Sequence, residues 1–161
     1  MNNPPGNPDE TLITIRKAAR TLTLRTEDGV ERTYKIALGN SPIGDKEREG
    51  DGRTPEGEFT VCARNPKSKF FLALGLSYPS KEDAERGLAA GLITKDQRDR
   101  IAAAIDAKER PPWDTPLGGE VFIHGGGTRS DWTRGCIALG NPDILAIFNT
   151  VPMGSRVVIL P

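Results

Sequence analysis

The chain has 161 residues, which fits one domain that buries roughly two thirds of its unfolded surface. Its 22 basic and 22 acidic side chains give a formal charge of zero, so nucleic acid and anionic lipid are not expected partners. No apolar run reaches the ~20 residues of a membrane-spanning helix, and 18 glycines with 13 prolines disfavour an all-helical bundle. Residues 1–10 are polar and proline-rich, which predicts a flexible N-terminal segment with no visible secretion signal.

Three short runs with alternating apolar residues follow, and each predicts a strand. They cover residues 12–15, 22–24 and 34–38. Asp28 and Gly29 lie between the second and third runs, and this dipeptide between alternating runs strongly favours a β-hairpin. A long loop rich in Gly, Pro and charge spans residues 40–57. Compact domains keep such loops mainly for function, although a mobile surface excursion is the alternative.

Two more strands are predicted over residues 58–63 and 70–76, after which the composition changes. Residues 80–107 are rich in Ala and charged side chains and lack Pro, which predicts a helical insert within residues 80–110. Thr94 and Gln97 have capping-box spacing, so a helix is expected to begin near Lys95. An earlier short helix is expected after residue 80.

The last part of the chain predicts a buried strand over residues 121–123, then a helix and a closing strand over 156–160. Asn141 and Pro142 have the pattern of an N-cap and a first-turn proline, which favours a helix over residues 143–150. The expected fold class is therefore mainly β (α+β), in a single domain over residues 11–161.

One His and one Cys have the spacing of a catalytic pair. His124 is the only histidine; it ends an apolar strand and precedes a glycine-rich loop, and Cys136 lies twelve positions further on. A thiol becomes a strong nucleophile once an imidazole accepts its proton. Gly135 permits a tight turn whose amides face a developing oxyanion. The alternatives are a histidine satisfied at a strand end and a small core cysteine.

The segments around these residues resemble the L,D-transpeptidase catalytic domain, or YkuD-type, family. The motif of that family is His-Gly, a loop, then Ser/Thr-X-Gly-Cys, and it matches residues 122–125 and 133–138. Residues 52–59 look like the Thr-Pro-X-Gly segment of the family, and residues 76–79 resemble a segment of one branch. The resemblance implies a β-sandwich or barrel with a helical insertion and one helix after the cysteine. It also implies that no metal or organic cofactor is needed.

The resemblance carries roles to individual residues. Cys136 takes the place of the nucleophile and His124 that of the general base, while the Gly125 carbonyl orients the imidazole. The amides of Arg134, Gly135 and Cys136 occupy the positions of the oxyanion hole. An activated thiol at this place is expected to titrate well below its usual value of about 8.5.

Two features depart from the family. Ala138 stands where many members have an arginine, and the loop from His124 to the cysteine is shorter than common. Arg129 or Arg134 could bind a substrate carboxylate instead, because a guanidinium pairs with a carboxylate through two bonds. Both could equally be solvated loop charges. Tyr78 is the best aromatic candidate for lining a substrate groove, with a purely structural role as the alternative.

The resemblance implies acyl transfer on peptidoglycan stem peptides, with a thioester at the L-centre of meso-diaminopimelate and release of D-Ala. An amine acceptor or water then resolves the thioester. The alternatives are an L,D-carboxypeptidase, a hydrolase of the lipoprotein-to-peptidoglycan amide, and a catalytically silent wall-binding module whose charged insert docks a partner. A periplasmic or cell-wall location is expected by resemblance.

Overall fold

The computed structural model describes residues 3–161 and contains one eight-stranded sheet and three α-helices within them. The strands are β1 (Leu12–Arg16), β2 (Thr21–Arg25), β3 (Glu31–Lys35), β4 (Gly57–Ser68), β5 (Phe71–Leu76), β6 (Phe122–His124), β7 (Ile137–Ala138) and β8 (Arg156–Leu160). The helices are α1 (Lys81–Ala89), α2 (Lys95–Asp106) and α3 (Asn141–Thr150). The strand order is β3-β2-β1-β8-β4-β5-β6-β7. The expectation of a mainly β fold with a helical insertion and one helix after the cysteine is confirmed.

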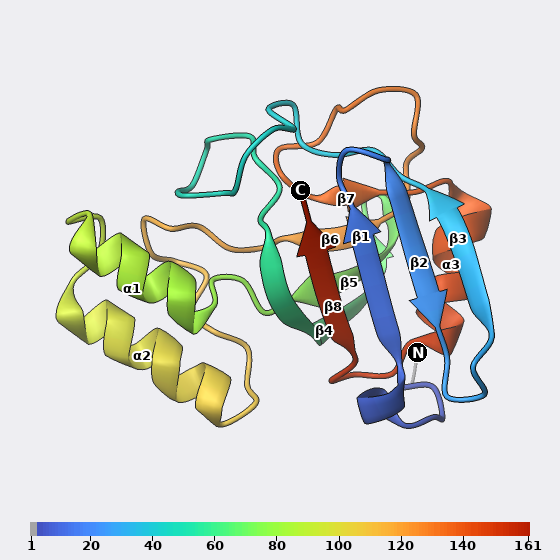
Figure 1. The fold of residues 1–161 in the computed structure, drawn as a ribbon, viewed down its shortest axis with the longest axis horizontal. Coiled ribbons are helices and arrows are strands. Elements are labelled where there is room, and N and C mark those ends of the chain that lie inside the picture. The colour runs from blue at the N-terminus through green and yellow to red at the C-terminus, as the bar shows by residue number, and fades with distance from the viewer. Residues whose placement is uncertain (1–2) are drawn as a thin grey trace.

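The sheet curls so that its two halves face each other. Strands β1, β2, β3 and β8 lie at the front of Figure 1, with β5 and β6 behind them. The side chains of β1 and β2 alternate, and Ile13, Ile15, Leu22 and Leu24 are buried in the core. The core also contains Phe148, which belongs to α3, and Figure 1 shows this helix behind β2 and β3. Period-two patterning thus places the core between the halves.

Strand β4 belongs to both halves. It pairs with β8 over residues 57–60 and with β5 from Val61 to Ser68. Register shifts lie between Val61 and Ala63 and between Asn65 and Ser68. Such irregularities bend a strand and let it pass from one layer to the other. The tip of the β4–β5 hairpin is thereby carried to the region of β6 and β7.

The β2–β3 hairpin forms as expected, with Asp28 Oδ1 accepting from the Val30 amide at 3.1 Å. The third strand, however, ends at Lys35 and not at residue 38. Beyond it the chain leaves β2, and Ala37 forms a bridge with Ala138 of β7. The strand therefore ends because the chain turns to a partner 101 positions away. Alternation of apolar residues within residues 34–38 carries no signal of that partner.

The two helices of the insert begin at the expected places. Ser80 caps α1 and Thr94 caps α2, each in a complete capping box. The pair projects from the side of the sheet (Figure 1). Its own small apolar cluster comprises Ala84, Ile93, Ile101 and Leu117, with partly buried neighbours packed against it.

The expected N-cap of α3 is wrong. The helix begins at Asn141, and its N-cap is Gly140, which makes no side-chain cap bond. The Asn141 Oδ1 atom instead accepts from the Gly126 amide at 3.0 Å. The side chain therefore fixes the loop after β6.

Hydrogen bonds hold part of the N-terminal segment in place. Pro8–Glu10 form a short 3-10 helix that Asn7 caps, and the Asn7 amide donates to Glu27 at 3.1 Å. The first two residues of the segment expected to be flexible lie outside the described residues. A search of residues 3–161 finds no helix with the length and apolarity to cross a bilayer.

Candidate active site

A cavity of about 900 Å³ opens beside β6 and β7, where the hairpin tip, the 40–57 loop and the 125–136 loop meet. Its lining includes the expected catalytic pair and the expected Gly135, together with three residues that the sequence analysis did not single out. These residues are Lys46, Phe70, His124, Trp132, Gly135 and Cys136.

Strand pairing explains why His124 and Cys136 share this cavity. Strands β6 and β7 are parallel, with His124 opposite Ala138. Cys136 lies immediately before β7, so the pairing brings it beside β6, the strand that carries His124. The 125–136 loop thus follows one residue that lines the cavity, His124, and ends with another, Cys136.

The imidazole of His124 is held in one orientation. Its Nδ1 lies 2.6 Å from the Gly125 carbonyl oxygen. Because a carbonyl oxygen only accepts, Nδ1 carries the proton and the lone pair lies on Nε2. Phe70 stacks on the ring with centroids 4.5 Å apart, and Trp132 meets it edge-on at 5.6 Å.

The surroundings of His124 favour its neutral form. Only 3% of the residue is exposed, and burial lowers the pKa of His124 below its ordinary value. The bond to the Gly125 carbonyl opposes this shift, and the charge of Lys69 adds to it. The imidazole is thus neutral at rest, with its free lone pair on Nε2.

The thiol of Cys136 is held by two backbone groups. Its Sγ accepts from the Phe122 amide at 3.4 Å and donates to the Glu120 carbonyl at 3.5 Å. Burial raises the pKa of Cys136; the Phe122 amide and Lys46 act against that shift, and the Glu120 carboxylate adds to it. Contrary to the expectation of a depressed thiol pKa, the pKa of Cys136 is raised, because burial outweighs the two groups that lower it.

The turn before the cysteine requires a glycine. Gly135 has φ of +138°, and a Cβ there would lie 2.7 Å from the Arg53 carbonyl oxygen. Thr133 pins the same turn, since its Oγ1 accepts from the Gly135 amide at 3.1 Å and donates to the Cys136 carbonyl at 2.7 Å.

The Gly135 amide is consequently engaged within the turn. Among residues 3–161, the amides of Arg134 and Cys136 have no hydrogen-bond partner. Of the three amides expected in an oxyanion hole, these two are free to donate.

The other residues expected to contact substrate do not all lie at the cavity. Arg134 is exposed and lines the cavity, whereas Arg129 is exposed outside its lining. The proposed groove role of Tyr78 is wrong, because this residue is fully buried and its hydroxyl donates to the Leu117 carbonyl at 2.8 Å. Burial raises the pKa of Tyr78 above its ordinary value. Tyr78, just after β5, is thus hydrogen-bonded to Leu117, whose side chain packs in the apolar cluster of the insert.

Sequence reasoning missed the part played by Phe70. Besides stacking on His124, it accepts the Gly125 amide on its carbonyl at 3.0 Å. Trp132 completes the aromatic wall, and its Nε1 donates to the Gly127 carbonyl at 3.0 Å. No local pattern marks Phe70, since its partner lies across the β5–β6 pairing.

Sequence reasoning also missed Lys46 in the 40–57 loop. Its Nζ donates to Asp51 at 2.9 Å and to the Arg48 carbonyl at 3.1 Å. The same loop is tied to the sheet, because Thr54 accepts the Gly39 amide at 3.1 Å. The loop is thus packed beside the cavity rather than a free surface excursion.

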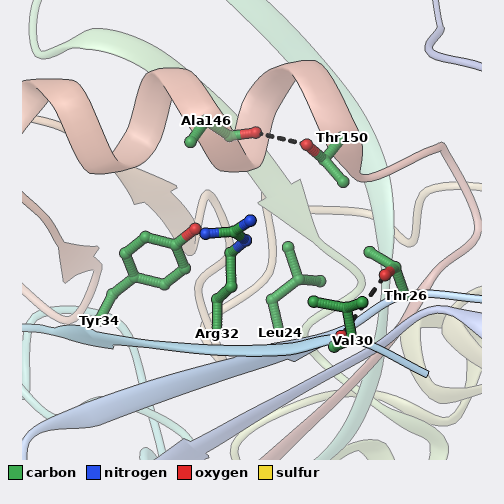
Figure 2. Close-up of a pocket in the computed structure, with 7 residues that line it drawn as sticks. All are labelled: Leu24, Thr26, Val30, Arg32, Tyr34, Ala146 and Thr150. Atoms are coloured by element: carbon green, nitrogen blue, oxygen red, sulfur yellow. Dashed lines mark hydrogen bonds between the residues drawn. The ribbon is translucent and has the colours of Figure 1, made fainter. Parts of the chain in front are cut away.

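A second, smaller cavity of about 150 Å³ lies between the β2–β3 hairpin and α3 (Figure 2). Its two threonine hydroxyls bond to nearby backbone carbonyls, Thr150 to Ala146 at 2.7 Å and Thr26 to Val30 at 3.4 Å. It contains no histidine or cysteine. Of the two cavities, only the larger one is lined by a histidine and a cysteine.

The model of the YkuD family, the L,D-transpeptidase catalytic domain, matches residues 10–159. The chain belongs to this family. Two relatives are named as candidate L,D-transpeptidases. The domain is 29% identical to YqjB of Bacillus subtilis (strain 168) over 167 residues, covering 96% of the chain and 72% of the relative. It is 34% identical to YafK of Escherichia coli (strain K12) over 81 residues, covering 47% of the chain but 33% of the relative.

Solved structures share the fold of this L,D-transpeptidase domain. The helical cell shape determining protein Pgp2 from Campylobacter jejuni aligns with a TM-score of 0.65 at 24% identity, over 94% of this chain and 48% of that one. An L,D-transpeptidase from Mycobacterium smegmatis aligns with a TM-score of 0.56 at 14% identity, over 94% and 59%. The domain thus spans about half the length of these two proteins.

Proposed function

We propose that the domain is a cysteine acyltransferase that acts on peptidoglycan stem peptides. The observation that supports the proposal is that a buried imidazole and a thiol both line one cavity, beside the paired strands β6 and β7. Family membership supports the choice of substrate class. The proposed site contains Cys136 as nucleophile, His124 as base and the Gly125 carbonyl as its orienting partner.

The first half-reaction begins when His124 Nε2 accepts the Cys136 proton and the sulfur attacks the carbonyl carbon at the L-centre of meso-diaminopimelate. The free amides of Arg134 and Cys136 donate to the resulting oxyanion. As the tetrahedral intermediate collapses, the C–N bond breaks and His124 returns the proton to the departing D-Ala amine. A thioester on Cys136 remains.

The neutral resting pair suits this sequence of steps. Proton transfer from sulfur to imidazole creates two charges at the moment when the sulfur attacks, so the site need not hold an isolated thiolate between turnovers. An amine then attacks the thioester in transpeptidation, or water attacks it in hydrolysis. Because the inferred substrate lies outside the cytoplasmic membrane, we place the working protein in the periplasm or at the cell wall.

The test measures D-Ala release from tetrapeptide muropeptides by mass spectrometry. We expect release by the natural chain, loss with Cys136→Ala, and release at the natural level with Cys62→Ala. The last variant is a matched control, because Cys62 is also a free cysteine but does not line the cavity. Equal release by the natural chain and Cys136→Ala overturns the proposal.

A second measurement separates transfer from hydrolysis. With an added D-amino acid as amine acceptor, a transpeptidase yields the exchanged tetrapeptide, whereas an L,D-carboxypeptidase yields only the tripeptide. Lipoprotein-linked muropeptides test whether the same site cleaves the lipoprotein-to-peptidoglycan amide. A protein that binds sacculi but releases nothing from any of these substrates is the silent wall-binding module.

A further inference from the structure

Lys46 is a charged side chain that the mechanism above does not use. It lies in the 40–57 loop and lines the cavity together with Cys136. Only 5% of its side chain is exposed. Lysine is seldom buried to this degree unless its charge is paired or has a task.

The bonds of Lys46 leave part of its ammonium group available. An ammonium group has three N–H bonds, and those to Asp51 and the Arg48 carbonyl account for two. Asp51 is in turn held by the amides of Glu47, Arg48 and Arg53, so the pair is fixed in place.

Only a glycine separates the ammonium group from the turn of the nucleophile. A Cβ built on Gly135 would lie 3.8 Å from Lys46 Nζ. Gly135 has no side chain, so the charge faces the backbone turn at which the thiolate and the oxyanion form. Because the Lys46 side chain is itself buried, water screens its charge less than that of a surface lysine at the same range.

The other charged or titratable groups around the cavity do not take its place. His124 is the neutral base, and Glu120 carries the opposite sign and opposes ionisation of the thiol. The remaining charged lining residues are Glu49, Lys67, Lys69 and Arg134, all of which are exposed. Among the positively charged residues that line the cavity within residues 3–161, Lys46 is the one that is buried.

The helical insert holds the Lys46 loop from the outside. Arg86 of α1 donates to the Lys46 carbonyl at 3.2 Å and to the Glu47 carbonyl at 3.2 Å. Asp83 orients this guanidinium at 3.0 Å. The insert thus reaches the active site through the backbone of the residue that carries the charge.

We propose that Lys46 supplies the fixed positive charge that stabilises the thiolate and the oxyanion at the Cys136 turn, and that Arg86 of the insert positions it. The oxyanion part rests on the proposed acyl transfer, whereas the thiolate part does not. Arg86 is a positioning residue, since it acts through the loop.

The experiment follows the rate of Cys136 alkylation by iodoacetamide against pH, in a Cys62→Ala background so that one thiol reacts. We expect Lys46→Met to raise the apparent thiol pKa by about one unit, equivalent to roughly tenfold slower alkylation below that pKa. Lys46→Arg retains most of the natural behaviour. Lys67→Met removes an exposed cation from the same cavity and changes the thiol pKa little, because water screens it.

Asp51→Asn separates an electrostatic effect from a structural one. Removing the counter-charge while keeping the ammonium group is expected to lower the thiol pKa, opposite in sign to Lys46→Met. Arg86→Met is expected to raise it, by less than Lys46→Met. An unchanged thiol pKa in Lys46→Met, or shifts of the same sign in Lys46→Met and Asp51→Asn, overturns the proposal. Should Lys46→Met fail to fold, an Asp51→Asn pKa that does not fall overturns it equally.

The assay uses no muropeptide, so its result is independent of the substrate. If Cys136→Ala still releases D-Ala, the proposed function fails while the thiol titration stands. If Lys46→Met leaves the titration unchanged and D-Ala release persists, the role of Lys46 fails and the proposed function stands.

Discussion

A single backbone carbonyl decides which nitrogen of His124 is basic. The Gly125 oxygen lies 2.6 Å from Nδ1, which leaves Nε2 as the acceptor. Burial lowers the pKa of His124 and raises that of Cys136, so both groups rest uncharged. The sequence motif identifies the pair, but it does not show how deeply His124 is buried, because the rings that cover it belong to Phe70 and Trp132.

Lys69 is expected to tune the base. Its charge lowers the pKa of His124, so Lys69→Met is expected to raise that pKa and move the acid limb of kcat/KM to higher pH. Lys69 is exposed, which limits the shift to roughly a few tenths of a unit and makes it shrink with added salt. The measurement is D-Ala release between about pH 4 and pH 8 at two salt concentrations. An acid limb that stays in place, or moves to lower pH, contradicts the assignment of His124 as base.

At the scale of elements, features set by near neighbours in the chain could be predicted and those set by distant partners could not. The capping box at Thr94 lies within four residues and is confirmed, and the helix expected after residue 80 begins with an equally local box at Ser80. Asn141 has the composition of a cap, yet it bonds to Gly126, fifteen positions away. Tyr78 is likewise buried in the core, where the carbonyl of Leu117, 39 positions further on, accepts its hydroxyl.

The helical insert is expected to open as a separate unit. Ile101 of α2 is fully buried in the small cluster of the insert, apart from the main core. Ile101→Ala is expected to lower the opening free energy of the insert by about 2–4 kcal/mol, through lost burial and a residual cavity. Hydrogen exchange is expected to speed up for amides of α1 and α2 and to stay unchanged in β1 and β8. Ile43→Ala, at a side chain 87% exposed, is the control with little effect. Equal acceleration throughout the sheet contradicts a separate unit.

At the scale of the molecule, the β1–β2 hairpin (residues 12–25, the N-terminal ribbon) is hydrogen-bonded to both loops of the site. Lys17, just after β1, donates from Nζ to the carbonyls of Gly44 and Thr54 at 2.7 Å each, inside the 40–57 loop. Arg20 donates to Asp131 in the 125–136 loop. These ties join residues up to 111 positions apart, so no window of sequence reveals them. The ribbon is far from the chemistry in sequence yet fixes the loops that surround it.

The tie between Arg20 and Asp131 is expected to make stability depend on pH. The Asp131 carboxylate accepts from Arg20 at 3.1 and 2.8 Å and from the Leu38 amide at 3.0 Å, and the Arg20 bond holds the pKa of Asp131 below its ordinary value. A carboxyl whose folded pKa is depressed stabilises the fold above its unfolded pKa, and this stabilisation is lost as pH falls through the folded value.

Asp131→Asn is therefore expected to lower the free energy of unfolding by about 1–2 kcal/mol at neutral pH, since the pair is partly exposed. The difference from the natural chain is expected to shrink as pH falls from about 5 to below about 3, where the natural carboxylate is itself protonated. Urea unfolding at a series of pH values measures it. Asp114→Asn, at an exposed carboxyl, is the matched control with no such trend. A difference that stays constant across this range means that the shape of the side chain, and not its charge, holds the ribbon to the 125–136 loop.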